Sequence, residues 1–226
     1  PIFGLFISNL FGMKGFVIGS ALCCLVSMVL IYMVKFPFKA PEEGLSIFSL
    51  DRFFLPQGKY LFVNLILVSM VLGILLSLVH SITFYGMMAV GFFVALLAQK
   101  FANANLKSET ITGLLTIAMA ILMFLTRKDS SVHLLIPAFI GFGVSLIASR
   151  FQLFFIKLSK HCQRGTSQSS YFLASELGLS IGLSLGWSYL FNTEFMALWV
   201  MFALVLMAFL YYNCFVHHWY MENKNR

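Results

Sequence analysis

Residues 164–191 read RGTSQSSYFLASELGLSIGLSLGWSYLF, an apolar segment of membrane-spanning length with one acidic residue, Glu176, near its middle. About 20 apolar residues are enough for a helix to cross the hydrocarbon core of a bilayer. A carboxylate in such a segment is costly when it faces lipid, so it normally faces a partner charge or a water-filled cavity. Because similar apolar segments recur along the chain, this stretch predicts an all-α fold, a polytopic bundle of membrane-spanning helices.

The composition supports a membrane protein. Of the 226 residues, 60% are apolar and 10% are charged, and the mean hydropathy is +0.92. A soluble domain carries about a quarter charged residues. An ordinary cytoplasmic enzyme is therefore excluded.

The apolar segments are separated by short polar breaks. We predict a partial helix at 1–10 and full spans at 15–35, 59–81, 83–103, 110–126, 133–157, 168–191 and 195–217. The corresponding division of the chain is a helical part at 1–35, a cytoplasmic linker at 36–58, a six-helix transmembrane part at 59–218 and a cytoplasmic tail at 219–226. Because most loops are short, sequential helices should be antiparallel neighbours in one bundle.

The basic residues indicate an orientation. If sides alternate and the linker is cytoplasmic, the inner side holds Lys35, Lys39, Arg52, Lys59, Lys100, Lys107, Lys157, Lys160, Arg164, Lys224 and Arg226, whereas the outer side holds Lys14, Arg127 and Lys128. Such an excess is expected on the cytoplasmic side, which places the C-terminus inside. It also accounts for the net charge of +7 without nucleic acid, because cations there can meet anionic lipid headgroups.

The first apolar run differs from a signal peptide. It begins at Pro1 and has no basic segment before it, whereas a signal peptide has one. It is also about half a span long. We therefore expect the chain to be a truncated or processed part of a larger protein.

Four segments resemble the major facilitator superfamily of transporters, entered partway through its sequence. They are PIFGLFISNLFGMKGF (1–16), VKFPFKAPEEG (34–44), SLDRFFLPQGK (49–59) and SKHCQRGTSQSSYFLASELGLSIG (159–182). The first is similar to the second half of that family's fifth helix, the next two to the linker between its halves, and the last to the loop before its eleventh helix. Arg164 and Gly165, with Gly178 and Gly182, carry the most specific part of this likeness.

The resemblance implies a fold and a mechanism. The chain would comprise part of helix five, helix six and the C-terminal six-helix half, with the N-terminal half missing. The family works by alternating access, in which two halves rock around a site near the bilayer midplane. One departure is the loop QKFANANLKSETITG at 99–113, where many members carry a Gly- and Arg-rich gating motif.

Arg150 and Glu176 are the leading site candidates. They lie at similar depths on consecutive antiparallel helices, so we expect them to pair, which would offset much of the desolvation cost of each. Two interpretations are open: a Glu176 that exchanges its arginine for a proton or substrate, or a fixed structural ion pair. Arg150 extending towards the cytoplasmic headgroups is a variant of the second.

Other polar and small residues follow helical spacing. Gly178, Gly182 and Gly186 recur every four residues, which is typical of closely packed membrane helices. Ser69, Ser77 and His80 should share one face of the helix at 59–81, turned towards the bundle or a cavity. Asn64, on the same helix, is a further candidate for the substrate or proton pathway.

No arrangement for catalysis or cofactor binding is evident in the sequence. It has no Gly-rich phosphate loop, and its four cysteines show no metal-binding spacing. We therefore predict neither an enzyme nor a cofactor or metal site. The expected function is secondary active transport of small molecules, most similar to proton-coupled efflux (antiport) across a bacterial inner membrane. The alternatives are a non-transporting membrane protein or remnant, and an intramembrane enzyme.

Overall fold

The computed structural model describes residues 2–34, 53–101, 105–126, 130–160, 163–190 and 193–224, and within these ranges the regular structure is entirely helical. The described helices belong to two units, Pro1–Ser49 and Leu50–Arg226. Most of the expected linker, residues 36–52, lies outside the described residues.

The first unit contains one long helix, α1 (Ile2–Met33), with a kink at Gly12. Gly12 has a φ of +67°, a left-handed conformation that glycine adopts without steric cost. The kink brings the two arms together, since a Cβ atom at position 4 would lie 3.1 Å from the ring of Phe16. The sequence break expected between 10 and 15 is therefore a sharp kink.

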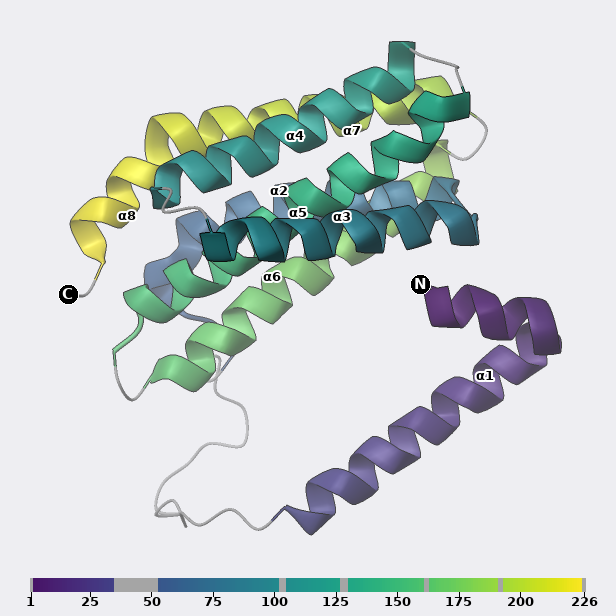
Figure 1. Ribbon diagram of the computed structural model, residues 1–226. Coiled ribbons are helices and arrows are strands. Elements are labelled where there is room, and N and C mark those ends of the chain that lie inside the picture. Colours follow the sequence, from purple (N-terminus) through teal and green to yellow (C-terminus); the bar gives the residue numbers. More distant parts are fainter. Residues whose placement is uncertain are drawn as a thin grey trace. The chain divides into compact units, whose positions relative to one another are not determined.

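The second unit is a bundle of long helices, shown in Figure 1. After a 3-10 turn, η2 (Pro56–Gly58), its helices are α2 (Lys59–Leu78), α3 (Ile82–Phe101), α4 (Leu106–Thr126), α5 (Ser130–Leu158), α6 (Arg164–Leu185) and α7 (Glu194–Tyr211). A π-helical turn, η4 (Gly186–Leu190), continues α6, and a second, η5 (Tyr212–Val216), joins α7 to α8 (His217–Asn223). The helix of the last span thus continues through most of the expected tail.

Glycines set the closest helix contacts in this bundle. α3 and α5 approach backbone to backbone, because a Cβ at Gly91 would lie 1.9 Å from the carbonyl oxygen of Ala138. α4 and α5 meet at Gly113, where a Cβ would lie 3.0 Å from the carbonyl oxygen of Gly143. Small residues allow this approach in membrane helices, and α5 consequently lies between α3 and α4.

An aromatic core closes one end of the bundle. Phe151 and Phe154 of α5 are fully buried, as are Tyr212 and Tyr220 near the end of the chain. The rings of Phe154 and Tyr220 have centroids 4.4 Å apart. This contact fixes α8 against the end of α5.

Among the described residues, six helices are long and apolar enough to cross a membrane. They cover Lys14–Met33, Pro56–Leu78, Ile82–Phe101, Leu106–Thr126, Val132–Leu158 and Glu194–Asn223. These helices support a multi-pass integral membrane protein. α6, where a full span was predicted, is long enough but more polar than the six.

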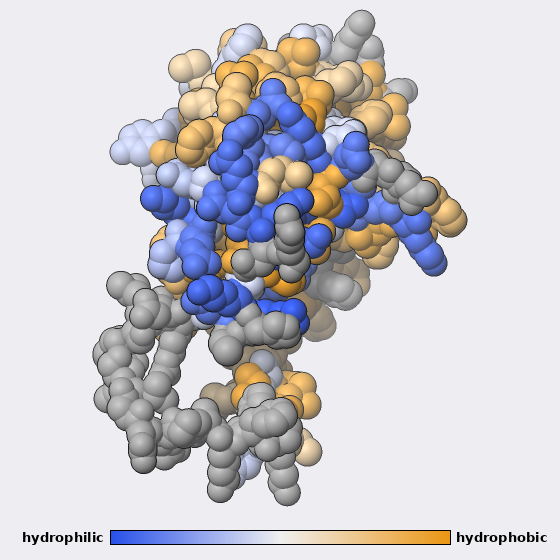
Figure 2. All heavy atoms as spheres, turned by 90° about the vertical axis from the view of Figure 1, so that its left-hand side faces the viewer, coloured by the Kyte–Doolittle hydropathy of each residue, from blue (hydrophilic) through white to orange (hydrophobic). Residues whose placement is uncertain are grey.

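Hydrophilic residues gather at one end of the bundle, which faces the viewer in Figure 2. α4 and α6 begin at this end, and α3, α5 and α8 finish there. Its exposed cations are Lys59, Lys100, Lys107, Lys157, Lys160 and Arg164. The described part of the chain therefore has a distinctly basic end.

Candidate functional site

α6 packs on α2 through the predicted glycine stripe. Gly178, Gly182 and Gly186 are buried. A Cβ at Gly182 would lie 2.2 Å from the carbonyl oxygen of Met70, and one at Gly186 would lie 1.8 Å from the hydroxyl of Ser77. These three positions therefore have no room for a side chain.

The order of these contacts shows that α2 and α6 are parallel. Along the two helices, the contacts pair Gly178 with Ile66, Gly182 with Met70 and Gly186 with Ser77. At 1.5 Å per residue, the shared stretch of α2 is about 16 Å long. Because α2 is apolar enough to span a membrane, this part of α6 lies at the same depth as a membrane-spanning segment.

The face of α6 opposite the glycines is exposed and partly polar. Glu176, Ser180 and Ser184 are exposed and follow one another at intervals of four residues, so they form a stripe along the helix. We call these three residues the α6 polar face. Within the described residues, Glu176 forms no ion pair.

The expected pairing of Arg150 with Glu176 is not formed. Arg150 donates from Nε to Oε2 of Glu109 on α4. The side chain of Glu109 is 6% exposed and that of Arg150 is 21% exposed. The partner was therefore predicted on the wrong neighbouring helix.

The packing of α4 on α5 explains why Arg150 pairs with Glu109 rather than with Glu176. Arg150 lies seven residues, two turns, after Gly143, and Glu109 lies one turn before Gly113. Because the helices are antiparallel, both steps lead in the same direction from the Gly113–Gly143 contact. The two side chains therefore meet on the facing sides of α4 and α5.

Glu109 also lines a small cavity of about 160 Å³ that α3, α4 and α5 enclose and whose surface is mostly apolar. Its second oxygen, Oε1, is buried without a hydrogen-bond partner in the described protein. Beside the cavity, Nε2 of Gln99 donates to the hydroxyl of Ser149 at 2.6 Å. Ser108 and Thr112 are further polar residues in its lining.

The remaining predicted pathway residues lie on or just after α2. Ser69 and Ser77 are buried at the α6 contact. Asn64 is fully buried, and its Nδ2 donates to the carbonyl of Ala208 on α7 at 2.9 Å. His80 is exposed and follows the end of the helix at Leu78. The structure thus brings Ser69 and Ser77, but not His80, onto the buried face.

Glu109 was missed because the sequence KSET, residues 107–110, reads as a polar break between spans. Its position relative to Gly113 was an available signal. A residue four positions before an interface glycine lies on the same helix face. Glutamate is also favourable in the first turn of a helix, where the peptide dipole is positive.

Within the part of the chain that the structure describes, no three His, Cys, Asp or Glu residues are placed to hold a metal ion. The candidate site is therefore built from two other features, the α6 polar face and the Glu109–Arg150 pair with its cavity.

The chain matches no protein-family model, no curated protein and no solved structure in the comparisons made with each. Its function is consequently inferred from these two polar features and from the bundle that carries them.

Proposed function

We propose that the chain belongs to a secondary active transporter that exports small molecules in exchange for protons by alternating access. A second proposal follows from the sequence, that it is a major facilitator-like C-terminal half that acts with preceding helices. The observation that carries the transport proposal is the α6 polar face. It lies on a helix parallel to a candidate membrane span, yet it presents a carboxylate and two hydroxyls outwards.

A charged group cannot face lipid at this depth without a large cost. Glu176 and Ser184 are eight residues apart, so the polar face extends over about 12 Å of helix. Water along this face would solvate the carboxylate and the hydroxyls together. An aqueous pathway through a helix bundle requires a polar helix face such as the α6 polar face.

In this mechanism Glu176 carries the proton. When ionised, it faces water on one side of the membrane; when protonated, it is neutral and passes through a closed, drier state at lower cost. A substrate that binds while the proton leaves would couple the two fluxes. Arg150 contributes in this proposal through its ion pair with Glu109, to which its Nε donates.

Cysteine accessibility tests the pathway. In full-length protein whose native cysteines are replaced by serine, S180C and S184C should react with a membrane-impermeant cationic thiol reagent in native membranes. M119C on α4 and M207C on α7 are the controls, because both side chains are exposed but on strongly apolar helices. If the two α6 positions are as unreactive as the controls, α6 faces lipid or protein and the proposal fails.

A second measurement tests the role of Glu176. In everted vesicles with an imposed proton gradient, added substrate candidates should release protons from wild-type protein but not from E176Q. E194Q is the matched control, since Glu194 is an exposed glutamate in the first turn of α7. A candidate that drives equal proton release in E176Q and wild type would exclude Glu176 as the coupling residue.

We also propose that the basic end of the bundle faces the cytoplasm of a bacterial cell, with the C-terminus inside. The clustered cations at that end support this orientation through the positive-inside rule. Reporter enzymes that are active on only one side of the inner membrane, fused after Arg226, measure it directly. An externally active fusion would reverse the orientation.

A further inference from the structure

The residues just before α2, residues 53–58, dock into the bundle, and we call them the docked segment. Leu55 is 1% exposed. Gly58 is also buried, and it leaves no room for a side chain, since a Cβ atom there would lie 2.9 Å from the ring of Phe155 on α5. The docked segment is therefore packed against the end of α5 before the chain enters α2.

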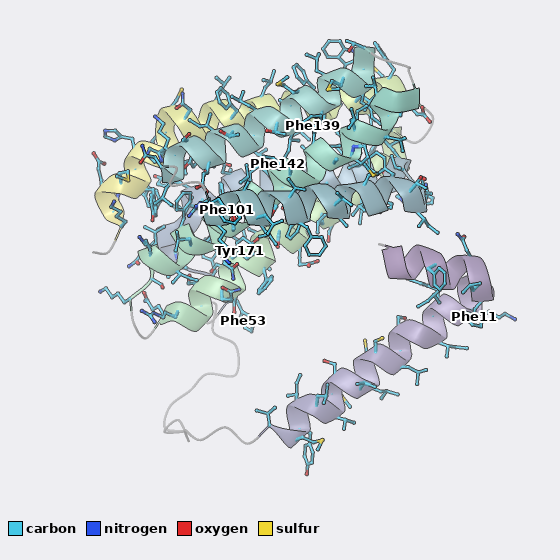
Figure 3. All side chains as sticks on the ribbon, viewed as in Figure 1. Phe11, Phe53, Phe101, Phe139, Phe142 and Tyr171 are labelled. Carbon is cyan, nitrogen blue, oxygen red and sulfur yellow. The ribbon has the colours of Figure 1, made fainter. Side chains whose placement is uncertain are left out.

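Ser170 of α6 supplies polar contacts to the docked segment. The backbone N–H of Leu55 donates to the Ser170 hydroxyl at 2.7 Å. That hydroxyl also lies within bonding distance of two carbonyls, 3.2 Å from Phe53 and 2.8 Å from Thr166 of its own helix. A hydroxyl has one hydrogen and two lone pairs, so Ser170 can accept from Leu55 and donate to Phe53 at the same time. In Figure 3, the labelled Phe53 lies beside α6.

Burial makes the Ser170 hydroxyl difficult to replace. Ser170 is 0% exposed and Leu55 is 1% exposed, so bulk water does not reach the Leu55 N–H as an alternative acceptor. A buried donor that loses its acceptor carries the full cost of its desolvation. Ser167, nearly one turn earlier on α6, is equally buried, but its hydroxyl has no hydrogen-bond partner in the described protein. The two buried serines of this helix therefore differ in whether they bond to the docked segment.

The Ser170 contact also fixes the position of the α6 polar face. Ser170 precedes Glu176 by six residues, which is about 9 Å along the axis of the same helix. The docked segment leads directly into α2, and α2 touches α6 again where Gly178 meets Ile66. The docked segment, α2 and α6 thus form a closed ring of contacts. A shift of α6 must either break the bonds of Ser170 or move the docked segment with it.

We propose that Ser170 is a positioning residue for transport, which ties α6 to the docked segment and thereby sets the position of Glu176. A displacement of the chain that precedes α2 reaches the carboxylate through this hydroxyl. The inference rests on the proposed function, in which Glu176 carries the proton. It adds that the chain before α2 acts directly on the helix that carries Glu176.

Spin labels measure the coupling. In full-length protein whose native cysteines are replaced by serine, labels at Q57C and I181C, both at exposed positions, report the distance between the docked segment and α6 by pulsed electron paramagnetic resonance in nanodiscs. We expect one narrow distance distribution in this parent protein and a broadened or second distribution in S170A. S167A is the matched control and should keep the parent distribution, because it removes a buried hydroxyl that has no described partner. Helicity and size-exclusion profile should be unchanged in both variants.

Cysteine accessibility measures the consequence for transport. The ratio of S180C labelling rates in right-side-out and everted vesicles, with a membrane-impermeant thiol reagent, should change about fivefold in S170A, the change in population that the loss of one hydrogen bond produces. S167A should leave the ratio unchanged. An unchanged distance distribution or an unchanged ratio in S170A would each overturn the inference and leave the proposed function intact. If S180C is unreactive even without the S170A change, the proposed function fails and the inference fails with it.

Discussion

Replacing Gly91 with alanine should separate α3 from α5, because the added methyl group would occupy backbone space. The new Cβ would lie 1.9 Å from the carbonyl oxygen of Ala138 and 2.6 Å from its carbonyl carbon. A carbon–oxygen contact normally needs about 3.3 Å, so the helices must move apart by about 1.4 Å. A backbone cannot rotate away as a long side chain can.

The size of the effect follows from overpacking. Extra methyl groups in a packed interior cost about 1–3 kcal/mol, which is roughly a 5- to 150-fold change in the folding equilibrium. Gly86 on the same helix is the matched control, because a Cβ there has nothing within 4 Å. G86A should be neutral or stabilise by up to about 1 kcal/mol, since alanine favours helix over glycine.

The assay is equilibrium unfolding in mixed micelles of a mild detergent with increasing sodium dodecyl sulfate, followed by circular dichroism or tryptophan fluorescence. G91A should unfold at a clearly lower fraction of dodecyl sulfate than wild type, and G86A at the same or a higher fraction. If G91A and G86A unfold together, α3 and α5 do not make the described backbone contact.

Two further predictions concern buried polar groups. R150M should destabilise the protein by about 3–5 kcal/mol, because it leaves Glu109 buried without its partner, whereas the double variant E109M/R150M should recover most of that loss. The same unfolding assay measures both variants. An additive loss of stability in the double variant would contradict the pairing. S170A should increase hydrogen exchange at the Leu55 amide by about fivefold, because that amide donates to the Ser170 hydroxyl at 2.7 Å and a typical hydrogen bond contributes about 1 kcal/mol. S175A is the control for exchange, since the Ser175 hydroxyl donates to the carbonyl of Phe172 in its own helix turn. Equal exchange at Leu55 in both variants would exclude the hydrogen bond from Ser170 as the cause.

Much of the helical framework could be predicted because membrane helices are set by length and apolarity. The predicted segments at 59–81 and 83–103 correspond to α2 and α3 within a few residues. The end of α2 differs because the backbone becomes extended at Val79, which removes His80 from the helix face assigned to it.

The partner of Arg150 was harder to predict, because both chain neighbours of α5, α4 and α6, are antiparallel to it and each carries a glutamate. Arg150 is at a suitable depth for both Glu109 and Glu176, and loop lengths do not distinguish them. The rotation of α5 about its axis decides the partner, and that rotation is set by the contact between Gly113 and Gly143. Such contacts depend on packing between distant segments, which local sequence patterns do not encode.

The seam between α2 and α6 has a mechanical consequence. Because glycine lets these backbones touch directly, few side chains lie between them that would have to repack. We therefore expect the two helices to move together as one rigid unit. Asn64 links this rigid unit of α2 and α6 to α7, because its side chain donates to the carbonyl of Ala208. A tilt of α6 would therefore pull on α7 as well, so a displacement of Glu176 along the helix axis would move three helices rather than one.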